Sequence, residues 1–524
     1  MNTKKCTILL LLIGFTTVSL LQAQKKYADA ITVKTSKQHL DILAGKEFEG
    51  RGTGQKGGRL AEEYIAKHFK AYGLKPIGDA TSYFQPVALR RSAYQVKQMK
   101  FGNTQLNYLN DFYVLGRNEM DVYQGDEIVF VGYGLQDVNY NEIKQMDLKG
   151  RIVMLYDEGE PVDQKGNSLL TGTPEKSEWT KNRFKRVQEI NKLKPKLVIA
   201  CSPSINPKSI RNMNALFGGS VALDKGEQVT PASSSGTDFV PVIHITEQVA
   251  DGVLAQCNTS LAKFKALAAL GVQESIILKT QIRTEMGHVN ARFSDANVIG
   301  LLPGTDLKEE YIVVCGHYDH EGILADGTFF PGADDNGSGS TAVLELARSF
   351  AQAKREGKGP RRSILFMAFA AEERGLLGSK YYVENPLVPL EQTVACINID
   401  MIGRIDDKHL NGNPNYIHPV GWDKLGKDLR TITEEVNNKY TQLELDTFYN
   451  DPQEPTRVYE RSDHYNFALK NIPSLYFFSG THPHYHTPED TVDKIDFPTM
   501  VKREKLIFHT IWEIANRTDR PKME

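Results

Sequence analysis

The segment Tyr311-Ile-Val-Val-Cys-Gly-His317 is the clearest indicator of the fold. It is an apolar, β-branched run of strand length that stops at a histidine, which is typical of a strand buried on both faces. Similar apolar runs follow at 363–371, 394–399 and 473–478. Helical patterns occur at 339–354, 421–437 and 498–516. This alternation predicts an α/β fold with a mixed central sheet covered by helices on both faces.

Candidate metal ligands stand where these strands end. His317 closes the first strand, Glu373 follows the second and Asp400 follows the third. His486 lies on the loop after the last strand, and Asp335 lies in a glycine-rich loop that opens a helix. Because ligands of such sheets bind beyond the carboxyl ends of the strands, we expect the five side chains to converge.

Two imidazoles and three carboxylates suit a pair of divalent metals. The three carboxylates and one bridging hydroxide would balance the charge of two divalent cations, and uncompensated charge in a cleft is costly. Mixed nitrogen and oxygen ligands favour zinc, although manganese or cobalt could substitute. The pattern therefore predicts a hydrolase with two Zn²⁺ per chain, and Glu372, beside the middle ligand, is the candidate base.

Each of these residues also has a purely structural interpretation. His317 could be an ordinary strand-end histidine, and Asp335 could belong to a turn that caps a helix. The Glu372-Glu373 pair could be solvated and Asp400 could cap a loop, but a solvated pair rarely follows eight apolar or small residues directly. The joint placement at successive strand ends favours the metal site.

The middle of the chain follows a different pattern. From 110 to 283, short β-rich runs are separated by polar loops rich in Gly, Pro and Ser. We expect a separate β-rich domain here, inserted between residues 24–109 and 284–524 of the main domain. A G-x-G-x-x-G pattern in 52–57 lacks the preceding strand that a dinucleotide site requires, so a glycine loop between two helices explains it better.

The N-terminus predicts export. Lys4 and Lys5 precede a mostly apolar run at 8–21, and Ala23 offers a cleavage position. We interpret residues 1–23 as a signal peptide, which gives a periplasmic or extracellular protein, with a retained N-terminal anchor as the alternative. No other stretch is apolar enough to span a bilayer, so no stable membrane insertion is expected. The formal net charge of −2 gives no indication of a nucleic-acid partner.

Four cysteines lie beyond that segment, too few for a disulfide framework in an exported chain of 524 residues. Cys315 and Cys396 lie in strand-like runs and read as small buried apolar residues. The sequence does not decide whether Cys201 and Cys257 form a disulfide bridge.

Several motifs resemble one enzyme family. They are HYDH (317–320), PGADDNGSGS (331–340), FAAEERGLLGS (369–379), NIDMIG (398–403), RSDHYNF (461–467) and HYHTPEDT (484–491). Together they resemble the zinc exopeptidases that include secreted bacterial leucyl-type aminopeptidases and, more distantly, glutamate carboxypeptidase and the transferrin receptor. The middle region is similar to the protease-associated domain inserted in many members, through VFVGYGL (129–135) and DLKGRIVML (147–155).

The resemblance implies a division of roles between the metal ligands. His317 and Asp400 would bind one metal, Glu373 and His486 the other, and Asp335 would bridge them. Asp334 then has no assigned role.

The resemblance also implies roles for residues beside the metals. Glu372 would be the general base. Asp319 would orient His317, and Tyr485 could donate a hydrogen bond to the oxyanion or serve only as an aromatic lid. Asp463 and His464 match the Ser-Asp-His signature without a firm role.

The expected activity is removal of N-terminal residues from peptide substrates by a hydroxide that bridges two zinc ions. A carboxypeptidase or dipeptidase on the same site is an alternative, as is a glutaminyl cyclase, which works with one metal. A non-catalytic binding protein is a further alternative, although such relatives lose metal ligands. The preferred first residue, the oligomeric state and the task of the inserted domain are not encoded in any motif.

Overall fold

The computed structural model describes residues 24–524 except 117, 145, 183, 207–208, 211–219, 227–239 and 325–326. The predicted signal peptide therefore lies outside the described residues. The chain divides into two compact units, which are described separately. Unit 1 comprises Met1–Leu89 and Phe293–Glu524, and unit 2 comprises Arg90–Arg292.

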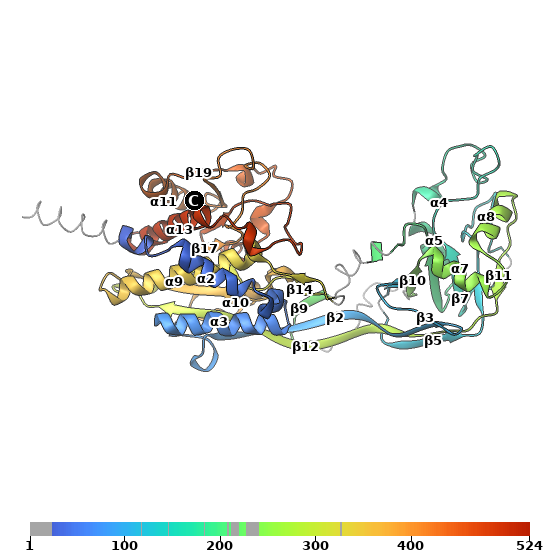
Figure 1. Cartoon of the computed structure of the whole chain (residues 1–524), viewed down its shortest axis with the longest axis horizontal. Helices are drawn as coiled ribbons and strands as arrows, with labels where there is room; N and C mark the ends of the chain where they lie inside the picture. Colours follow the sequence, from blue (N-terminus) through green and yellow to red (C-terminus); the bar gives the residue numbers. More distant parts are fainter. Residues whose placement is uncertain are drawn as a thin grey trace, which may run out of the picture. The chain divides into compact units, whose positions relative to one another are not determined.

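Unit 1 is built on a mixed sheet with the strand order β19-β18-β20-β17-β13-β16-β12-β2. Figure 1 labels β2, β12, β17 and β19 of this sheet. The strands are β2 (Phe84–Phe101), β12 (Ile282–Leu302), β13 (Leu307–His317), β16 (Arg362–Phe369), β17 (Thr393–Ile399), β18 (Tyr416–Val420), β19 (Glu444–Leu445) and β20 (Ser474–Phe478). Strand β13 runs parallel to β16 and β17, and β17 runs parallel to β20. Strands β12 and β18 are antiparallel to their neighbours β16 and β20.

Helices cover both faces of this sheet, which confirms the predicted fold class. Successive residues of the central strands alternate between two cores: Val314 packs in one and Cys315 in the other. The first core includes residues of α2 (Val33–Leu43), α3 (Lys56–Tyr72), α9 (Gly339–Arg355), α11 (Asp428–Val436) and α13 (Phe497–Asn516). The second includes residues of α10 (Leu377–Glu384) and α12 (His464–Ala468).

Two sequence-based boundaries in unit 1 differ from the structure. The helix expected at 421–437 begins only at Asp428, because Gly421 and Gly426 have φ angles of 78° and 146°, which an α-helix does not allow. Strand β18 was not expected, since Pro419 interrupts the pattern and proline is uncommon inside strands.

Unit 2 contains a six-stranded sheet with the order β11-β6-β7-β8-β10-β4. These strands are β4 (Phe112–Leu115), β6 (Ile128–Phe130), β7 (Ile152–Tyr156), β8 (Leu197–Cys201), β10 (Val242–Ile245) and β11 (Ile276–Leu278). Strands β6, β7, β8 and β10 are parallel, and the two outer strands are antiparallel to their neighbours.

Helices contribute to unit 2 alongside its strands. The described ones are α4 (Glu178–Lys181), α5 (Phe184–Lys192), α7 (Glu247–Ala255) and α8 (Leu261–Ala269). The limits of the unit also differ from the expected 110 and 283. Strands β2 and β12 alternate polar and apolar residues across the division, so no change of composition marks it.

The cysteines Cys201, Cys257, Cys315 and Cys396 are all free thiols. The Sγ atoms of Cys315 and Cys396 lie 3.7 Å apart in the interior of unit 1. No helix among the described residues has the length and apolar character needed to cross a membrane.

Candidate metal centre

The parallel strands of unit 1 bring the predicted ligands to one edge of the sheet. His317 is the last residue of β13, and Asp400 follows β17 directly. Glu372 and Glu373 open the short turn Glu372–Arg374 after β16. Because β16, β13 and β17 are parallel neighbours, their carboxyl ends deliver these side chains to one place.

Asp335 lies between two groups of ligands. Its Oδ1 atom is 3.6 Å from His317 Nε2, which in turn is 3.3 Å from Asp400 Oδ1. Its Oδ2 atom is 2.9 Å from His486 Nε2, which is 3.1 Å from Glu373 Oε2. The two oxygens of Asp335 thus face two different His–carboxylate pairs, as a carboxylate shared by two metals must.

Unpartnered atoms show that this donor set fits metal ions. Asp400 Oδ1 and His486 Nε2 are buried atoms without a hydrogen-bond partner. Buried polar atoms of this kind are rare in proteins unless a ligand or ion satisfies them. A divalent cation near each histidine would do so.

The electrostatics of the site also favour the binding of cations. Burial lowers the pKa of His317, but Glu372, Asp400 and Asp335 offset this and raise the pKa well above its usual value. Burial likewise lowers the pKa of His486, whereas the neighbouring carboxylates of Asp335 and Glu373 raise it to about 11. The cluster therefore attracts positive charge strongly.

Asp319 supports the site in a different way from the one expected. His317 Nδ1 contacts the backbone carbonyl of Asp319 at 3.1 Å, whereas the carboxylate Oδ1 is 4.0 Å away. That carboxylate accepts hydrogen bonds from the Glu372 backbone N–H and the Thr53 hydroxyl, each at 3.0 Å. The histidine is oriented by the main chain, and the Asp319 side chain holds the turn that carries Glu372.

Asp334, which had no assigned role, stabilises the loop after Asp400. Its Oδ1 atom accepts hydrogen bonds from Gly403 N at 2.7 Å and from Ser338 Oγ at 2.9 Å. Its Oδ2 atom lies 3.3 Å from His482 Nε2. Its neighbour Asp335 therefore faces the ligand cluster, while Asp334 faces the loop.

His320 contributes to the centre although the sequence did not single it out. Its Nδ1 atom lies 2.7 Å from Glu373 Oε1, which leaves Oε2 of the same carboxylate facing His486. The motif HYDH contains His320, so its position one residue after Asp319 was the available signal.

Ser462 is a second contributor that sequence reasoning did not identify. Its hydroxyl donates a hydrogen bond to Asp400 Oδ2 at 2.7 Å and accepts one from Asn398 at the same distance. This leaves Oδ1 of Asp400 free to face His317. The Ser-Asp-His signature thus acts on a ligand through its serine. Asp463 beside it is fully buried, and burial raises its pKa to about 7.

A small hollow of about 40 Å³ opens beside the ligands. Apart from the ligands and Glu372, its lining residues are Met401, Val458, Arg461, Tyr476, Phe478, Thr481 and Tyr485. Arg461 donates a hydrogen bond from Nη2 to the Tyr485 hydroxyl at 3.3 Å, and the Tyr485 ring stacks on His486. One wall is therefore apolar, and one margin carries a cation.

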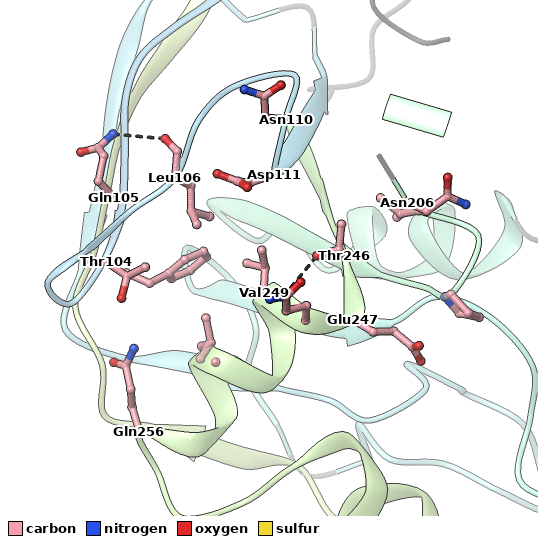
Figure 2. A pocket seen from close by; sticks show the side chains of 16 residues that line it. Thr104, Gln105, Leu106, Asn110, Asp111, Asn206, Thr246, Glu247, Val249 and Gln256 are labelled. Atoms are coloured by element: carbon pink, nitrogen blue, oxygen red, sulfur yellow. Dashed lines mark hydrogen bonds between the residues drawn. The ribbon is translucent and has the colours of Figure 1, made fainter. Parts of the chain in front are cut away.

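Unit 2 has a larger hollow of about 600 Å³. Figure 2 shows its lining side chains, among them Asn110, Asn206, Thr246, Glu247 and Gln256. In contrast to unit 1, the described part of unit 2 contains no cluster of three or more metal-binding side chains.

Comparisons with known proteins agree with this geometry. Residues 297–511 match a family model described as Peptidase family M28. Aminopeptidase YwaD of Bacillus subtilis is 30% identical over 241 residues, which cover 43% of this chain and 46% of YwaD. Leucine aminopeptidase 1 of Arthroderma otae is 32% identical over 234 residues, 43% of this chain and 59% of that relative. The chain thus spans about half the length of such relatives.

Solved structures share the fold at low identity. An aminopeptidase from Aneurinibacillus sp. is 18% identical, with 96% of this chain and 98% of that chain covered and a TM-score of 0.50. BSAP, a zinc aminopeptidase from Bacillus subtilis, is 17% identical, with 93% and 96% covered and a TM-score of 0.52. At these identities the likeness concerns the fold alone.

Proposed function

We propose that the chain is a zinc-dependent aminopeptidase, because its residues 297–511 match the model of Peptidase family M28. Its substrates would be peptides with a free amino terminus, from which it removes the first residue by hydrolysis. The observation that carries the proposal is the Asp335 carboxylate, whose two oxygens face two separate His–carboxylate pairs. The relatives named as aminopeptidases support the same choice.

Two zinc ions fit the donor set. His317 and Asp400 would hold one, Glu373 and His486 the other, and Asp335 both. When bound, they would polarise the scissile carbonyl and supply the bridging hydroxide that the sequence predicts.

In this proposal Glu372 moves the proton. Its Oε2 atom lies 3.8 Å from His317 Nε2, within the same group as Asp400, and its backbone is held by Asp319. Burial raises the pKa of Glu372 well above its usual value, whereas two nearby cations would lower it. The balance suits a carboxyl that takes a proton from water and passes it to the leaving amine near neutral pH.

In this proposal Tyr485 stabilises negative charge on the substrate carbonyl oxygen. Burial raises the pKa of its hydroxyl, so the hydroxyl keeps its proton. The hydroxyl therefore remains a donor, and Arg461 occupies its acceptor side. A fixed donor beside the metals would strengthen its hydrogen bond as the oxyanion develops.

The hollow suggests which first residues are accepted. Met401, Val458 and Phe478 form an apolar wall beside the ligands. An apolar side chain of the first residue would bury surface there, whereas a charged side chain would lose hydration. We therefore expect leucyl or similar substrates to be preferred over acidic ones.

One observation favours a dipeptidase or carboxypeptidase as the second candidate. Arg461 brings a guanidinium to the margin of the hollow, and guanidinium groups bind carboxylates well. A free substrate carboxylate close to the scissile bond would match that charge.

The proposal also covers where the protein acts and what unit 2 is. Cleavage of residues 1–23 would release the enzyme into the periplasm or outside the cell, where peptide nutrients are met. Unit 2 would be a protease-associated domain, as its sequence resemblance implies.

A substrate panel tests the proposal. Purified protein loaded with zinc is assayed on leucyl and glutamyl anilides, free dipeptides and N-blocked peptides, with and without chelator. We expect leucyl anilide to be cleaved and chelation to abolish this. Cleavage of N-blocked peptides but not of anilides would support the second candidate.

A further inference from the structure

A second group of metal-binding side chains lies in unit 1, apart from the ligands described above. Asp406 and His409 lie on the loop between β17 and β18, His418 lies in the middle of β18, and Asp446 follows β19. Asp406, His409 and His418 are 2%, 9% and 0% exposed. We propose that these three residues bind a further divalent metal ion, with Asp446 as the outer support of both histidines.

The inner atoms of the group have the spacing of a ligand set. Asp406 Oδ1 lies 2.7 Å from His409 Nδ1, and Asp406 Oδ2 lies 3.0 Å from His418 Nε2. One ligand atom from each residue falls within 4.8 Å of the others. Two imidazoles and one carboxylate, with a fourth place left for water, form a common zinc donor set.

The other ring nitrogens of His409 and His418 lie near Asp446. The Asp446 backbone carbonyl lies 3.3 Å from His418 Nδ1. The Asp446 carboxylate lies 3.6 Å from His409 Nε2 and 3.7 Å from His418 Nδ1. Metal-bound histidines usually donate their other ring N–H to such a carbonyl or carboxylate. His317 shows the same arrangement, with Nε2 toward carboxylates and Nδ1 against the carbonyl of Asp319.

The tautomer of His418 that donates to Asp446 favours a cation between the inner atoms. A neutral His418 that donates from Nδ1 to Asp446 has a lone pair on Nε2, which faces the Asp406 carboxylate at 3.0 Å. Two acceptors at that distance repel each other unless a proton or a metal lies between them. A divalent ion between Asp406 and His418 would satisfy both acceptors at once, and His409 lies within reach of the same ion.

The further metal site would stabilise one wall of the small hollow beside the ligands of the first centre. His418 pairs with Phe478 of β20, and Phe478 lines that hollow. A Cβ on Gly480 would lie 2.3 Å from Asp406 Oδ2, so the carboxylate packs directly on the main chain after β20. The ion would therefore fasten the loop after Asp400 to the segment after β20. This role does not depend on the proposed peptidase activity.

Metal content tests the site. Zinc per chain is measured by elemental analysis after dialysis against buffered zinc, in wild type, His409→Gln, His418→Gln and the control His288→Gln in unit 2. Each of the first two variants is expected to hold one equivalent less than wild type, and the control the same amount as wild type. This difference is independent of how many ions the catalytic centre binds, so it separates the two proposals.

Equal zinc in wild type and both cluster variants would overturn the inference and leave a hydrogen-bonded group of two aspartates and two histidines. A variant-free measurement covers the case in which a substitution prevents folding. Anomalous diffraction at the zinc edge from wild-type crystals is expected to show a peak roughly 2.0–2.2 Å from His418 Nε2. Absence of that peak would also overturn it.

Discussion

Both units contain parallel strands whose carboxyl ends border a hollow, but the two ends carry different chemistry. In unit 1, β13, β16 and β17 lead into His317, Glu372 and Asp400. In unit 2, β8 and β10 lead into Asn206 and Thr246, around the larger of the two hollows. The described part of unit 2 has no metal-binding cluster. Sheet topology thus creates a cavity in both units, and the residues that follow each strand decide whether it can catalyse.

The largest effect is expected when the shared carboxylate of unit 1 is removed. Asp335→Ala deletes the group that faces both histidines, so both metals should be lost along with nearly all turnover. Elemental analysis and an anilide assay check this. The control is Asp493→Ala, on an exposed carboxylate of the same unit; full activity of Asp335→Ala would contradict the account.

Removing the base should separate metal binding from turnover. Glu372→Gln keeps the five ligands, so zinc content should stay at the wild-type value. Loss of the proton carrier should lower kcat by roughly 10²–10⁴-fold. Glu384→Gln, at the exposed end of α10, serves as the matched control. If Glu372→Gln retained most of its turnover, another group would have to be the base.

The hydroxyl of Tyr485 is expected to matter somewhat less. Tyr485→Phe removes one donor beside the developing oxyanion and should lower kcat by about 10²-fold, with little change in KM. Tyr465→Phe on α12 is the control. An unchanged kcat would assign Tyr485 the alternative role of an aromatic lid that packs on His486.

A smaller effect is expected at Asp319. Asp319→Asn weakens its hydrogen bond to the backbone of Glu372 but leaves the carbonyl that contacts His317. Groups that orient ligands or catalytic residues typically change activity by about 10–100-fold, and we expect the lower end of that range. Zinc affinity should change little; a large loss of zinc would show that the carboxylate, and not the carbonyl, orients His317.

The smallest effect on activity is expected from a substitution in unit 2. Gln248→Ala, at an exposed lining residue of its hollow, should leave kcat/KM for a leucyl anilide unchanged, because the described part of unit 2 contributes no residue to the ligand cluster. A tenfold loss would give the unit 2 hollow a part in the reaction and remove the contrast between the units.

The sequence was most informative where strands end. Continuous apolar runs locate buried strands, and parallel neighbours must bring their carboxyl ends together, so the convergence of His317, Glu373 and Asp400 followed from pattern alone. The sequence did not predict which oxygen of each carboxylate faces the neighbouring ligand. Ser462 turns one oxygen of Asp400 away from His317 through a contact 62 residues distant in sequence.

Other features were missed for equally physical reasons. His418 lies in a strand that contains Pro419, which weakened the strand signal and with it the link between Asp406 and Asp446. The helices of unit 2 are short; α5, α7 and α8 each have nine residues, and polar loops surround them. Such elements are stabilised by tertiary packing more than by local sequence.

Digestion of a free heptapeptide, followed by mass spectrometry with zinc and with chelator, shows which end of a peptide the enzyme attacks and whether it needs metal. We predict that zinc-loaded protein removes residues one at a time from the amino terminus and that chelation stops this. Loss of residues from the carboxyl terminus, an internal cut, or cleavage that continues without metal would contradict the account.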